Sequence, residues 1–284
     1  MNPHDIGESP EETTAEEGGL IPSTRHHAYS LQMPADLPIP VLIAVPHAGR
    51  EYPEPLIGKM RHPEYSKIRL EDRFVDRIAK AIARQTGAGL LVANAPRAMI
   101  DLNRATDDVD WDMIIDGAPE GARHSAANRR ARSGLGLVPR RLPGLGEIWK
   151  SRLTKSELTS RIRQIHVPYH AALSAGLRRL HNQWGAAILL DLHSMPPLKV
   201  SHPDDVAAQF VIGDRFGATV NDRLVAGALR NLAEQGRRVA HNRPYAGGYV
   251  LDRHAAPNHE IHAIQVEVCR SLYLSDDMRE ITEG

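Results

Sequence analysis

Two short apolar runs of this chain end at histidines, and a third contains a glutamate. His47 follows residues 41–45, His193 follows residues 187–190, and Glu267 lies in the last apolar run before the C-terminus. A continuous apolar run of this length predicts a buried strand. Open α/β sheets bind their ligands outside the carboxyl ends of such strands. We therefore expect the two histidines and the glutamate to meet at one edge of a sheet.

Segments with a helical period separate the apolar runs. The period predicts amphipathic helices over 68–85, 155–184 and 218–235, and Pro168 should kink or divide the second of them. Strands are predicted over residues 41–45, 90–93, 98–102, 187–190, 207–212 and 261–268. This alternation predicts an α/β fold, a three-layer α/β/α sandwich around a central mixed, mostly parallel sheet.

The chain is predicted to consist of a lead-in and one domain that carries an insertion. Residues 1–37 begin with an acidic, polar stretch, which predicts a disordered or extended N-terminal lead-in. Residues 38–284 predict a single domain. Within it, residues 107–147 show no sustained period and are dominated by Gly, Pro, Arg and acidic residues. We interpret them as a loop-rich insertion in a position to cover the site.

The balanced charge argues against a nucleic-acid-binding or membrane-binding protein, and the single cysteine argues against a disulfide-bonded one. Lys plus Arg and Asp plus Glu number 35 each, so no net field attracts nucleic acid or a membrane surface. Six arginines between residues 123 and 141 lack aromatic neighbours and are interpreted as a solvated loop rather than a nucleic-acid patch. One cysteine excludes an intrachain disulfide, and no apolar run of about 18 residues predicts a membrane span. We expect a cytoplasmic protein that binds a small molecule. Self-association into a homo-oligomer stays open.

Two histidines and a group of acids predict a metal site. A hydrolytic zinc ion needs about three nitrogen or oxygen ligands and one open position. His47 and His193 are the nitrogen candidates because both follow predicted strands, although a single histidine in that place is more often structural. The oxygen ligand is expected from Glu71, Asp72 or Asp76. The helix dipole alone explains one or two acids at a helix N-terminus, but not Asp76, which lies beyond the first turn.

A rival pair of metal ligands lies in the second predicted helix. His166 and His170 are four residues apart, a spacing that places two imidazoles on one helix face. Metalloprotease helices with this spacing carry Glu directly after the first histidine, whereas this chain has Val167 there. We therefore favour a substrate-contacting or proton-handling role for Tyr169 and His170.

Residues 97–104 predict a clamp for an anionic substrate. Arg97 and Arg104 flank Asp101 and Asn103 around a short predicted strand. Arginine binds a carboxylate through two parallel hydrogen bonds and stabilises a developing oxyanion. One such arginine would be explained by a surface ion pair, but two that flank a buried segment favour a binding role.

Glu267 is the residue that we predict to act as the general base. Its neighbours in the run are apolar, and burial raises the pKa of a carboxyl toward the range that is useful for proton transfer. A structural ion pair with Arg270 is the alternative. Gly248 belongs to a Gly-Gly turn at residues 247–248, for which we expect a role in the site.

In their order, these motifs resemble the N-formylglutamate amidohydrolase family over residues 38–275. More distantly, the chain is similar to zinc carboxypeptidases and aspartoacylases. The matching stretches are Pro46-His47-Ala48-Gly49, Tyr52-Pro53, Glu71-Asp72-Arg73-Phe74-Val75-Asp76, Pro96-Arg97, Asp101-Leu102-Asn103-Arg104, Tyr169-His170, Asp191-Leu192-His193-Ser194, Gly247-Gly248-Tyr249 and Gln265-Val266-Glu267.

The resemblance implies an α/β/α sandwich with a zinc site. It assigns the metal ligands to His47, Asp72 and His193, with Glu71 or Asp76 as substitutes for Asp72. The chain departs from the carboxypeptidases at Arg50, which stands where their acidic ligand would be, so the acid is expected from the following helix.

The resemblance also implies the other roles in the site. Glu267 would be the base, Arg97 would polarise the scissile carbonyl, and Asn103 with Arg104 would hold the substrate carboxylate. The further candidates for substrate contact are Asp101, Tyr169, His170 and Gly248.

The leading hypothesis is zinc-dependent hydrolysis of the amide bond of an N-acylated acidic amino acid, in amino-acid catabolism. N-formyl-L-glutamate, cleaved to L-glutamate and formate, is the first choice of substrate. A zinc carboxypeptidase or a peptidoglycan-type amidase would use the same residues. A non-catalytic carboxylate-binding protein is the third hypothesis.

Overall fold

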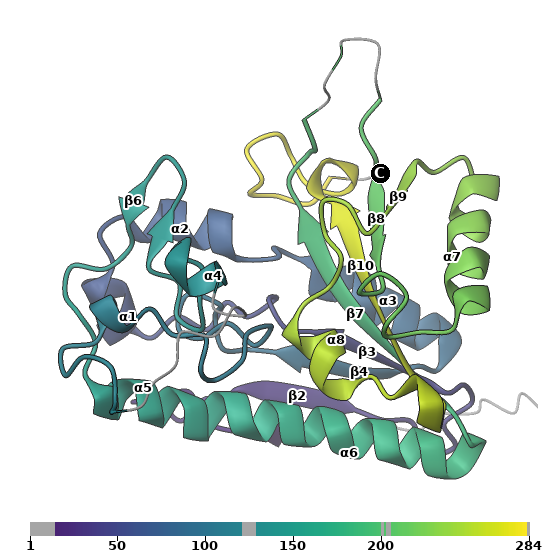
Figure 1. The fold of residues 1–284 in the computed structure, drawn as a ribbon, viewed down its shortest axis with the longest axis horizontal. Helices are drawn as coiled ribbons and strands as arrows, with labels where there is room; N and C mark the ends of the chain where they lie inside the picture. Colours follow the sequence, from purple (N-terminus) through teal and green to yellow (C-terminus); the bar gives the residue numbers. More distant parts are fainter. Residues whose placement is uncertain (1–14, 121–128, 200–201, 203–205, 283–284) are drawn as a thin grey trace, which may run out of the picture.

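An eight-stranded sheet forms the centre of the protein (Figure 1). The computed structural model describes residues 15–120, 129–199, 202 and 206–282. In spatial order the strands are β1 (Glu16–Gly18), β2 (Tyr29–Gln32), β4 (Gly89–Ala93), β3 (Val41–Val45), β7 (Ala187–Met195), β10 (Ile261–Cys269), β8 (Phe210–Gly213) and β9 (Val239–His241).

The sheet is mixed and mostly parallel, as predicted. The four central strands β4, β3, β7 and β10 are parallel to one another, whereas β2 and β8 run antiparallel to the neighbours at either side of this group. Strand β7 is longer than its apolar run and continues through His193. Glu267 lies within β10, as predicted, and His47 follows the end of β3.

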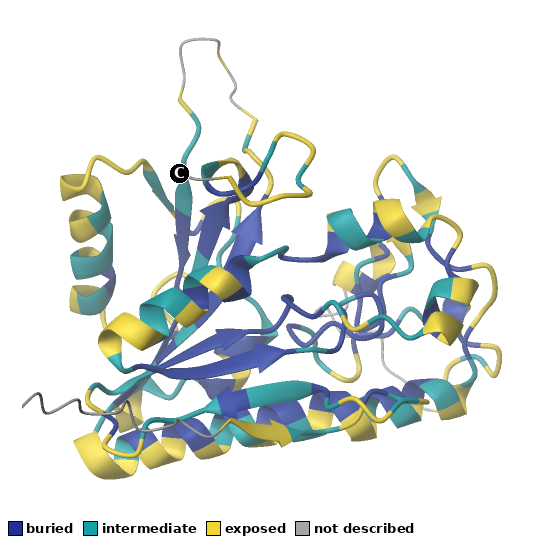
Figure 2. Ribbon diagram, turned by 180° about the vertical axis from the view of Figure 1, so that it is seen from behind, coloured by how far each residue is buried: buried dark blue, intermediate teal, exposed yellow. Residues whose placement is uncertain are grey.

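Helices cover both faces of the sheet and make three layers (Figures 1 and 2). On one face, Leu173 and Leu180 of α6 (Val167–Trp184) pack with Leu189 of β7, and the short helix α8 (Tyr249–His254) lies on the same side. On the other face, Val75 of α3 (Val75–Thr86) packs with Leu192, and α7 (Asp222–Glu234) covers β8 and β10. Successive side chains of a strand point to opposite faces, and most residues of β7 and β10 are buried, because both faces of the sheet are covered.

Irregular segments beside the sheet form a lobe that carries short elements. These are α1 (Glu54–Lys59), α2 (Pro63–Leu70), the 3-10 turn η1 (Trp111–Met113), α4 (Arg129–Arg132), the strand pair β5 (Arg141–Leu142) and β6 (Gly146–Glu147), and α5 (Lys155–Arg161). Three further turns are the π-helical η3 (Ile162–His166) and the 3-10 turns η4 (Pro257–His259) and η5 (Arg270–Leu272). Residues 107–147, expected as a loop-rich insertion, contribute η1, α4, β5 and β6, and residues 121–128 lie outside the described part.

Two predictions of secondary structure are wrong, one for a helix and one for a strand. The single helix predicted over 68–85 is divided, because α2 ends at Leu70 and α3 begins at Val75. Between them the backbone turns so that the Asp72 N–H bonds to the His47 carbonyl at 2.9 Å. The strand predicted over 98–102 is a turn segment, in which Met99 N–H donates to Pro96 O. In both places, contacts with distant segments outweigh the local pattern.

The N-terminal segment belongs to the sheet. Strands β1 and β2 lie within residues 1–37, for which a disordered or extended lead-in was expected, and they pair with each other and with β4. Ile21 and Leu31 are buried. Of the lead-in, residues 1–14 lie outside the described residues.

The helix predicted over 155–184 is divided ahead of Pro168, as expected. The π-helical turn η3 separates α5 from α6, and Val167 N–H donates to Ile162 O, five residues back. Proline has no N–H for the carbonyl four residues before it, so the Gln164 carbonyl is free to accept from Leu20 N–H at 2.9 Å. Across the part of the chain that the structure covers, no helix has the length and apolar character needed to cross a bilayer.

Candidate active site

His47, Asp72 and His193 converge in one buried cluster. They come from the end of β3, from the turn between α2 and α3, and from β7. One nitrogen of each imidazole and one Asp72 oxygen lie within 4.8 Å of one another. His193 Nδ1 is 2.9 Å and His47 Nδ1 is 3.5 Å from Asp72 Oδ2. All three side chains are almost completely excluded from solvent.

A second carboxylate stands behind each histidine. The His47 Nε2–H donates to Asp101 Oδ1 at 2.7 Å, and the His193 Nε2–H donates to Asp191 Oδ2 at 3.0 Å. Such carboxylates fix the tautomer and the orientation of an imidazole. Both rings therefore present Nδ1 toward Asp72. Asp101, predicted to contact substrate, is fully buried and serves His47 instead.

Arg270 holds Asp72 in place. Its Nη2 donates to Asp72 Oδ1 at 3.1 Å, while its Nε donates to Ser194 Oγ at 3.0 Å. One Asp72 oxygen is thus occupied, and the other faces the histidines. The alternative ion pair between Arg270 and Glu267 is wrong, because Arg270 lies against the turn that carries Asp72.

The buried charges shift one another's pKa. Burial alone would raise the pKa of Asp72, but the neighbouring imidazoles of His193 and His47 hold it well below its ordinary value. Burial would lower the pKa of His193, yet Asp191 and Asp72 raise it well above the usual range. Burial would raise the pKa of Asp101, but the charges of Arg97 and His47 hold it well below its ordinary value.

The cluster fits a divalent cation. Buried His47 Nδ1 has no hydrogen-bond partner among the described residues, which is unfavourable unless a ligand satisfies it. Two imidazole nitrogens and one carboxylate oxygen are also the donor set of hydrolytic zinc sites.

The other candidate ligands lie elsewhere. Asp76 pairs with Arg50 at 2.9 Å and with Lys80 at 3.1 Å. Glu71 lies near Arg73. Of the three acids, Asp72 is the one that the fold brings to the histidines.

Glu267 lies beside the cluster on the neighbouring strand. It is the register partner of His193 on β7 and is 7 % exposed. Gln265 Nε2–H donates to Glu267 Oε1 at 2.9 Å. Burial raises the pKa of Glu267 to about 7, and the charge of His193 offsets part of that effect. A carboxylate with this pKa can accept a proton near neutral pH.

Asn103 and Arg104 are held by a network around the turn of residues 97–104. Asn103 Oδ1 accepts from Val250 N–H at 2.9 Å, and its Nδ2 lies 3.4 Å from Gln265 Oε1. Arg104 donates to the Asn103 and Leu135 carbonyls. A Cβ on Gly248 would lie 2.6 Å from Asn103 Oδ1, so a glycine is needed there for this close approach.

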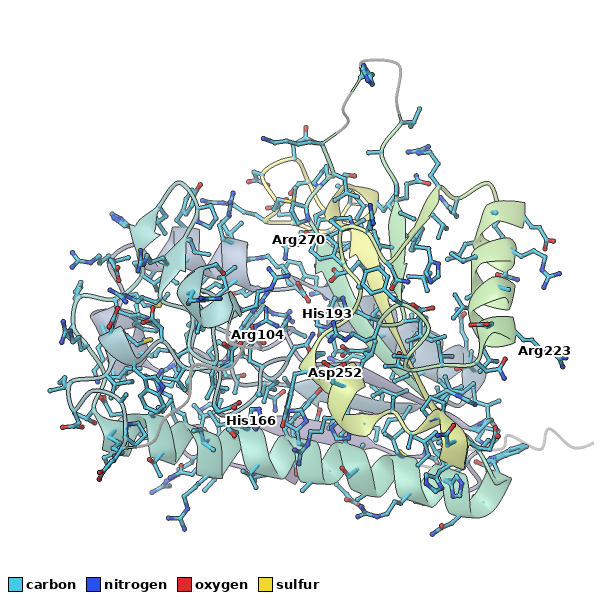
Figure 3. All side chains as sticks on the ribbon, in the orientation of Figure 1. Arg104, His166, His193, Arg223, Asp252 and Arg270 are labelled. Carbon is cyan, nitrogen blue, oxygen red and sulfur yellow. The ribbon has the colours of Figure 1, made fainter. Side chains whose placement is uncertain are left out.

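A cavity of about 440 Å³ joins these groups. It lies where the lobe meets the carboxyl ends of the strands, and Figure 3 shows Arg104, His193 and Arg270 gathered there. The lining includes the predicted residues His47, Asp72, His193, Glu267, Arg97, Asn103, Arg104 and Gly248. Sites for small molecules typically measure about 300–1,000 Å³.

Two predicted substrate contacts lie behind the cavity. Tyr169 is fully buried against Tyr29, and no group in the described part of the chain forms a hydrogen bond with its hydroxyl. His170 donates to the Leu102 carbonyl. Neither residue lines the cavity. Among the residues that the structure describes, His166 and His170 belong to no cluster of three metal-ligating side chains, and His166 bonds to the Arg104 carbonyl.

Sequence reasoning missed several residues of the site. Asp191 and Gln265 each stand two residues before a predicted site residue, so the period of a strand places them on the same face. That signal was available. Nothing local indicates Arg270 as the partner of Asp72, or Arg130 of the insertion as part of the lining.

The fold and the site together indicate the class of protein to which this chain belongs. An α/β sheet whose edge carries a buried carboxylate, arginines and a candidate cation site is typical of a hydrolytic enzyme. The family can be stated as well. The chain belongs to the N-formylglutamate amidohydrolase family, whose model matches residues 39–274.

Relatives of known name support the assignment. The chain is 28 % identical over 242 residues to an N-formylglutamate deformylase of Pseudomonas putida, a match that covers 84 % of this chain and 83 % of that protein. It is 26 % identical over 253 residues to an N-formylglutamate deformylase of Pseudomonas aeruginosa, with the same coverage.

Solved structures share the fold. An N-formylglutamate amidohydrolase from Ralstonia eutropha JMP134 superposes with a TM-score of 0.80 at 34 % identity, over 90 % of this chain and 91 % of that one. A gene product of Agrobacterium tumefaciens has a TM-score of 0.59 at 16 % identity, over 86 % of each chain, and shows the fold alone.

Proposed function

We propose that this protein is a zinc-dependent hydrolase of N-formyl-L-glutamate, which releases formate and L-glutamate. The observation that carries the proposal is that one cavity joins a His-Asp-His cluster, a buried carboxylate and several arginines. Relatives named N-formylglutamate deformylases cover more than four fifths of the chain and support the choice of substrate.

The cavity matches a substrate with two carboxylates. Asn103 and Arg104 would bind the carboxylate next to the scissile amide, since arginine and amide donors suit its oxygens. Arg69 and Arg130 also line the cavity, and neither forms an ion pair with a carboxylate in the described parts of the chain. They are the partners that we propose for the side-chain carboxylate.

Residues of this chain provide the proton transfers. Glu267 takes a proton from the water that attacks the formyl carbon and passes it to the departing amine nitrogen as the C–N bond breaks. Arg97 stabilises the negative charge on the former carbonyl oxygen. His47, Asp72 and His193 would hold the zinc ion, which when bound supplies Lewis acidity to activate water and polarise the carbonyl.

The test compares metal content with formate release. We expect the parent protein to bind zinc and to release formate, and to lose that activity in a chelator and regain it with zinc. H47A and H193A should lose zinc, whereas H259A, at an exposed histidine, should keep zinc and activity.

The role of Glu267 is tested in the same assay. E267Q should keep its zinc and lose about 10²–10⁴-fold in kcat. Formate release that survives complete removal of metal contradicts the zinc mechanism. Zinc with turnover of short peptides or peptidoglycan fragments, but not of formylglutamate, favours a peptidase or an amidase. Ligand binding without turnover favours a binding protein.

A further inference from the structure

One helix face carries three buried donors that no catalytic step uses. Arg161, His166 and His170 lie on the continuous helical stretch formed by α5, the π turn and α6. All three side chains are largely buried. Figure 3 shows His166 between α6 and Arg104.

All three donors reach the backbone of the turn that carries the proposed carboxylate clamp. Arg161 Nη1 donates to the Met99 carbonyl at 2.9 Å. His170 Nε2 donates to Leu102 O at 3.0 Å, and His166 Nε2 donates to Arg104 O at 2.9 Å. The carbonyls are acceptors, so each ring carries its hydrogen on Nε2. The turn belongs to no helix or strand. The amides of Met99, Asp101 and Arg104 bond to backbone carbonyls, whereas the carbonyls of Met99, Leu102 and Arg104 accept from the three side chains.

The π turn brings the donors into line. Its hydrogen bonds join residues five apart, so Arg161 and His166 come to nearly the same face. His170 follows four residues later in α6, which keeps it on that face. In an uninterrupted α-helix, Arg161 and His166 would point in different directions. Turns of this kind occur often at functional sites.

His170 is itself held by a directed chain of hydrogen bonds. Because its Nε2 carries the hydrogen, its Nδ1 must accept when the ring is neutral, and it accepts from His254 Nε2–H at 2.9 Å. His254 Nδ1 is then also an acceptor, 3.3 Å from the Ser174 hydroxyl. Each ring has one allowed tautomer. Burial lowers the pKa of His170 to about 2 and that of His254 to about 3, so both stay neutral.

We infer that His166 and His170 are positioning residues, which set Asn103 and Arg104 for the substrate carboxylate next to the scissile amide. The inference rests on the proposed function for the identity of that carboxylate. It predicts that loss of a donor weakens recognition of the carboxylate and leaves the proton transfers at Glu267 intact.

The test uses L-glutamate and its α-carboxamide, L-isoglutamine, as probes whose binding needs no turnover. We expect H170L to weaken L-glutamate binding by about tenfold or more, the effect of losing one charge-assisted interaction, and to change isoglutamine binding less than about twofold. H170Q retains an amide donor and should restore most of the affinity. H181L, a change at the far end of α6, should bind like the parent. H166L is the second variant if H170L does not fold.

Kinetics separate this inference from the proposed function. With N-formyl-L-glutamate, H170L should raise KM by a similar factor while kcat changes less than about twofold. The positioning role is overturned if H170L weakens the binding of both probes equally or if H170Q fails to restore the affinity. It is also overturned if both leucine variants bind L-glutamate like the parent, or if the parent does not bind L-glutamate. A parent that binds L-glutamate but releases no formate rejects the proposed function, and the variants still test the positioning role through binding.

Discussion

At the scale of single residues, the site is a set of buried charges that are paired unequally. Asp72, Asp101 and Asp191 each have a histidine or arginine within hydrogen-bond distance, as buried charges require. Glu267 has the amide of Gln265 instead. This difference explains why the pKa of Glu267 is raised while those of Asp72 and Asp101 are lowered. The carboxyl without a hydrogen-bonded cation is the one suited to act as a base.

Gly248 gives a test at this scale. G248A should push Asn103 out of place, because the new Cβ would lie 2.6 Å from Oδ1 and 2.8 Å from Nδ2. The backbone at Gly248 is extended, so a side chain brings no backbone strain. We expect kcat/KM for formylglutamate to fall about tenfold or more, mainly through KM, because one hydrogen-bonding group of the clamp is lost. The matched control is G227A in α7, where no atom of the described residues lies within 4 Å of the added Cβ. A normal KM for G248A would contradict the clamp at Asn103.

At the scale of elements, one helical stretch both packs the sheet and supports the site. Leu173 and Leu180 bury one side of α6 against the strands, while the π turn directs polar donors to the turn of residues 97–104. The missing amide of Pro168 lets the Gln164 carbonyl bind the N-terminal segment. An irregularity in the helix therefore connects three parts of the molecule.

The histidine chain between α6 and α8 makes stability depend on pH. His170 and His254 have pKa values of about 2 and about 3 in the folded state, below the unfolded value of about 6.5. The unfolded chain therefore binds more protons below that pH, and their contribution to stability, fully present above pH 6.5, is lost progressively as the pH falls. Each histidine contributes a slope of at most about 1.4 kcal/mol per pH unit.

Urea unfolding at pH 7, 6 and 5 measures this slope. The free energy of unfolding of H254Q should fall less steeply than that of the parent, by about 1 kcal/mol per pH unit between pH 6 and 5. Carboxylates affect both proteins equally and cancel in the difference. H181Q, at a histidine whose side chain is not fully buried, should follow the parent. Parallel curves for H254Q and the parent would show that His254 is protonated in the folded protein.

At the scale of the whole molecule, the site forms where the lobe meets the sheet. His47 and Asp101 are 54 residues apart, His193 and Asp72 are 121 apart, and Arg270 and Asp72 are 198 apart. Such contacts exist only after the sheet has assembled. The N-terminal segment is part of that assembly, since β2 pairs with β4 and Leu20 bonds to the π turn.

Adjacent residues of the N-terminal segment test its contribution. Ile21 is 1 % exposed and Leu20 is 46 % exposed. I21A should lower the free energy of unfolding by about 2–5 kcal/mol, the usual loss for a buried isoleucine. L20A should lower it by less than about 1 kcal/mol. Denaturant titration measures both. Equal, small effects would show that residues before β3 do not stabilise the domain.

Local pattern was enough to predict the class of fold and many of the polar residues. Apolar runs and helical periods indicated the central strands and the helices α6 and α7, because burial of one face imposes a period on the sequence. The short strands β1, β2 and β9 were missed, since three or four residues carry too little period. The segment 98–102 was misread as a strand because its burial comes from the lobe and not from a sheet.

The amino-acid order alone determined which polar side chains share a face of β7 and β10, because alternation along a strand places Asp191 with His193 and Gln265 with Glu267. Folding in three dimensions settled which acid meets the histidines and what His166 and His170 bind. Residue type alone does not separate Glu71, Asp72 and Asp76, and the backbone bond from Asp72 N–H to the His47 carbonyl brings Asp72 to the histidines. The local sequence around one residue does not predict its contacts with residues far along the chain. Those contacts form when the lobe packs against the sheet, so the tertiary structure determines which side chains pair.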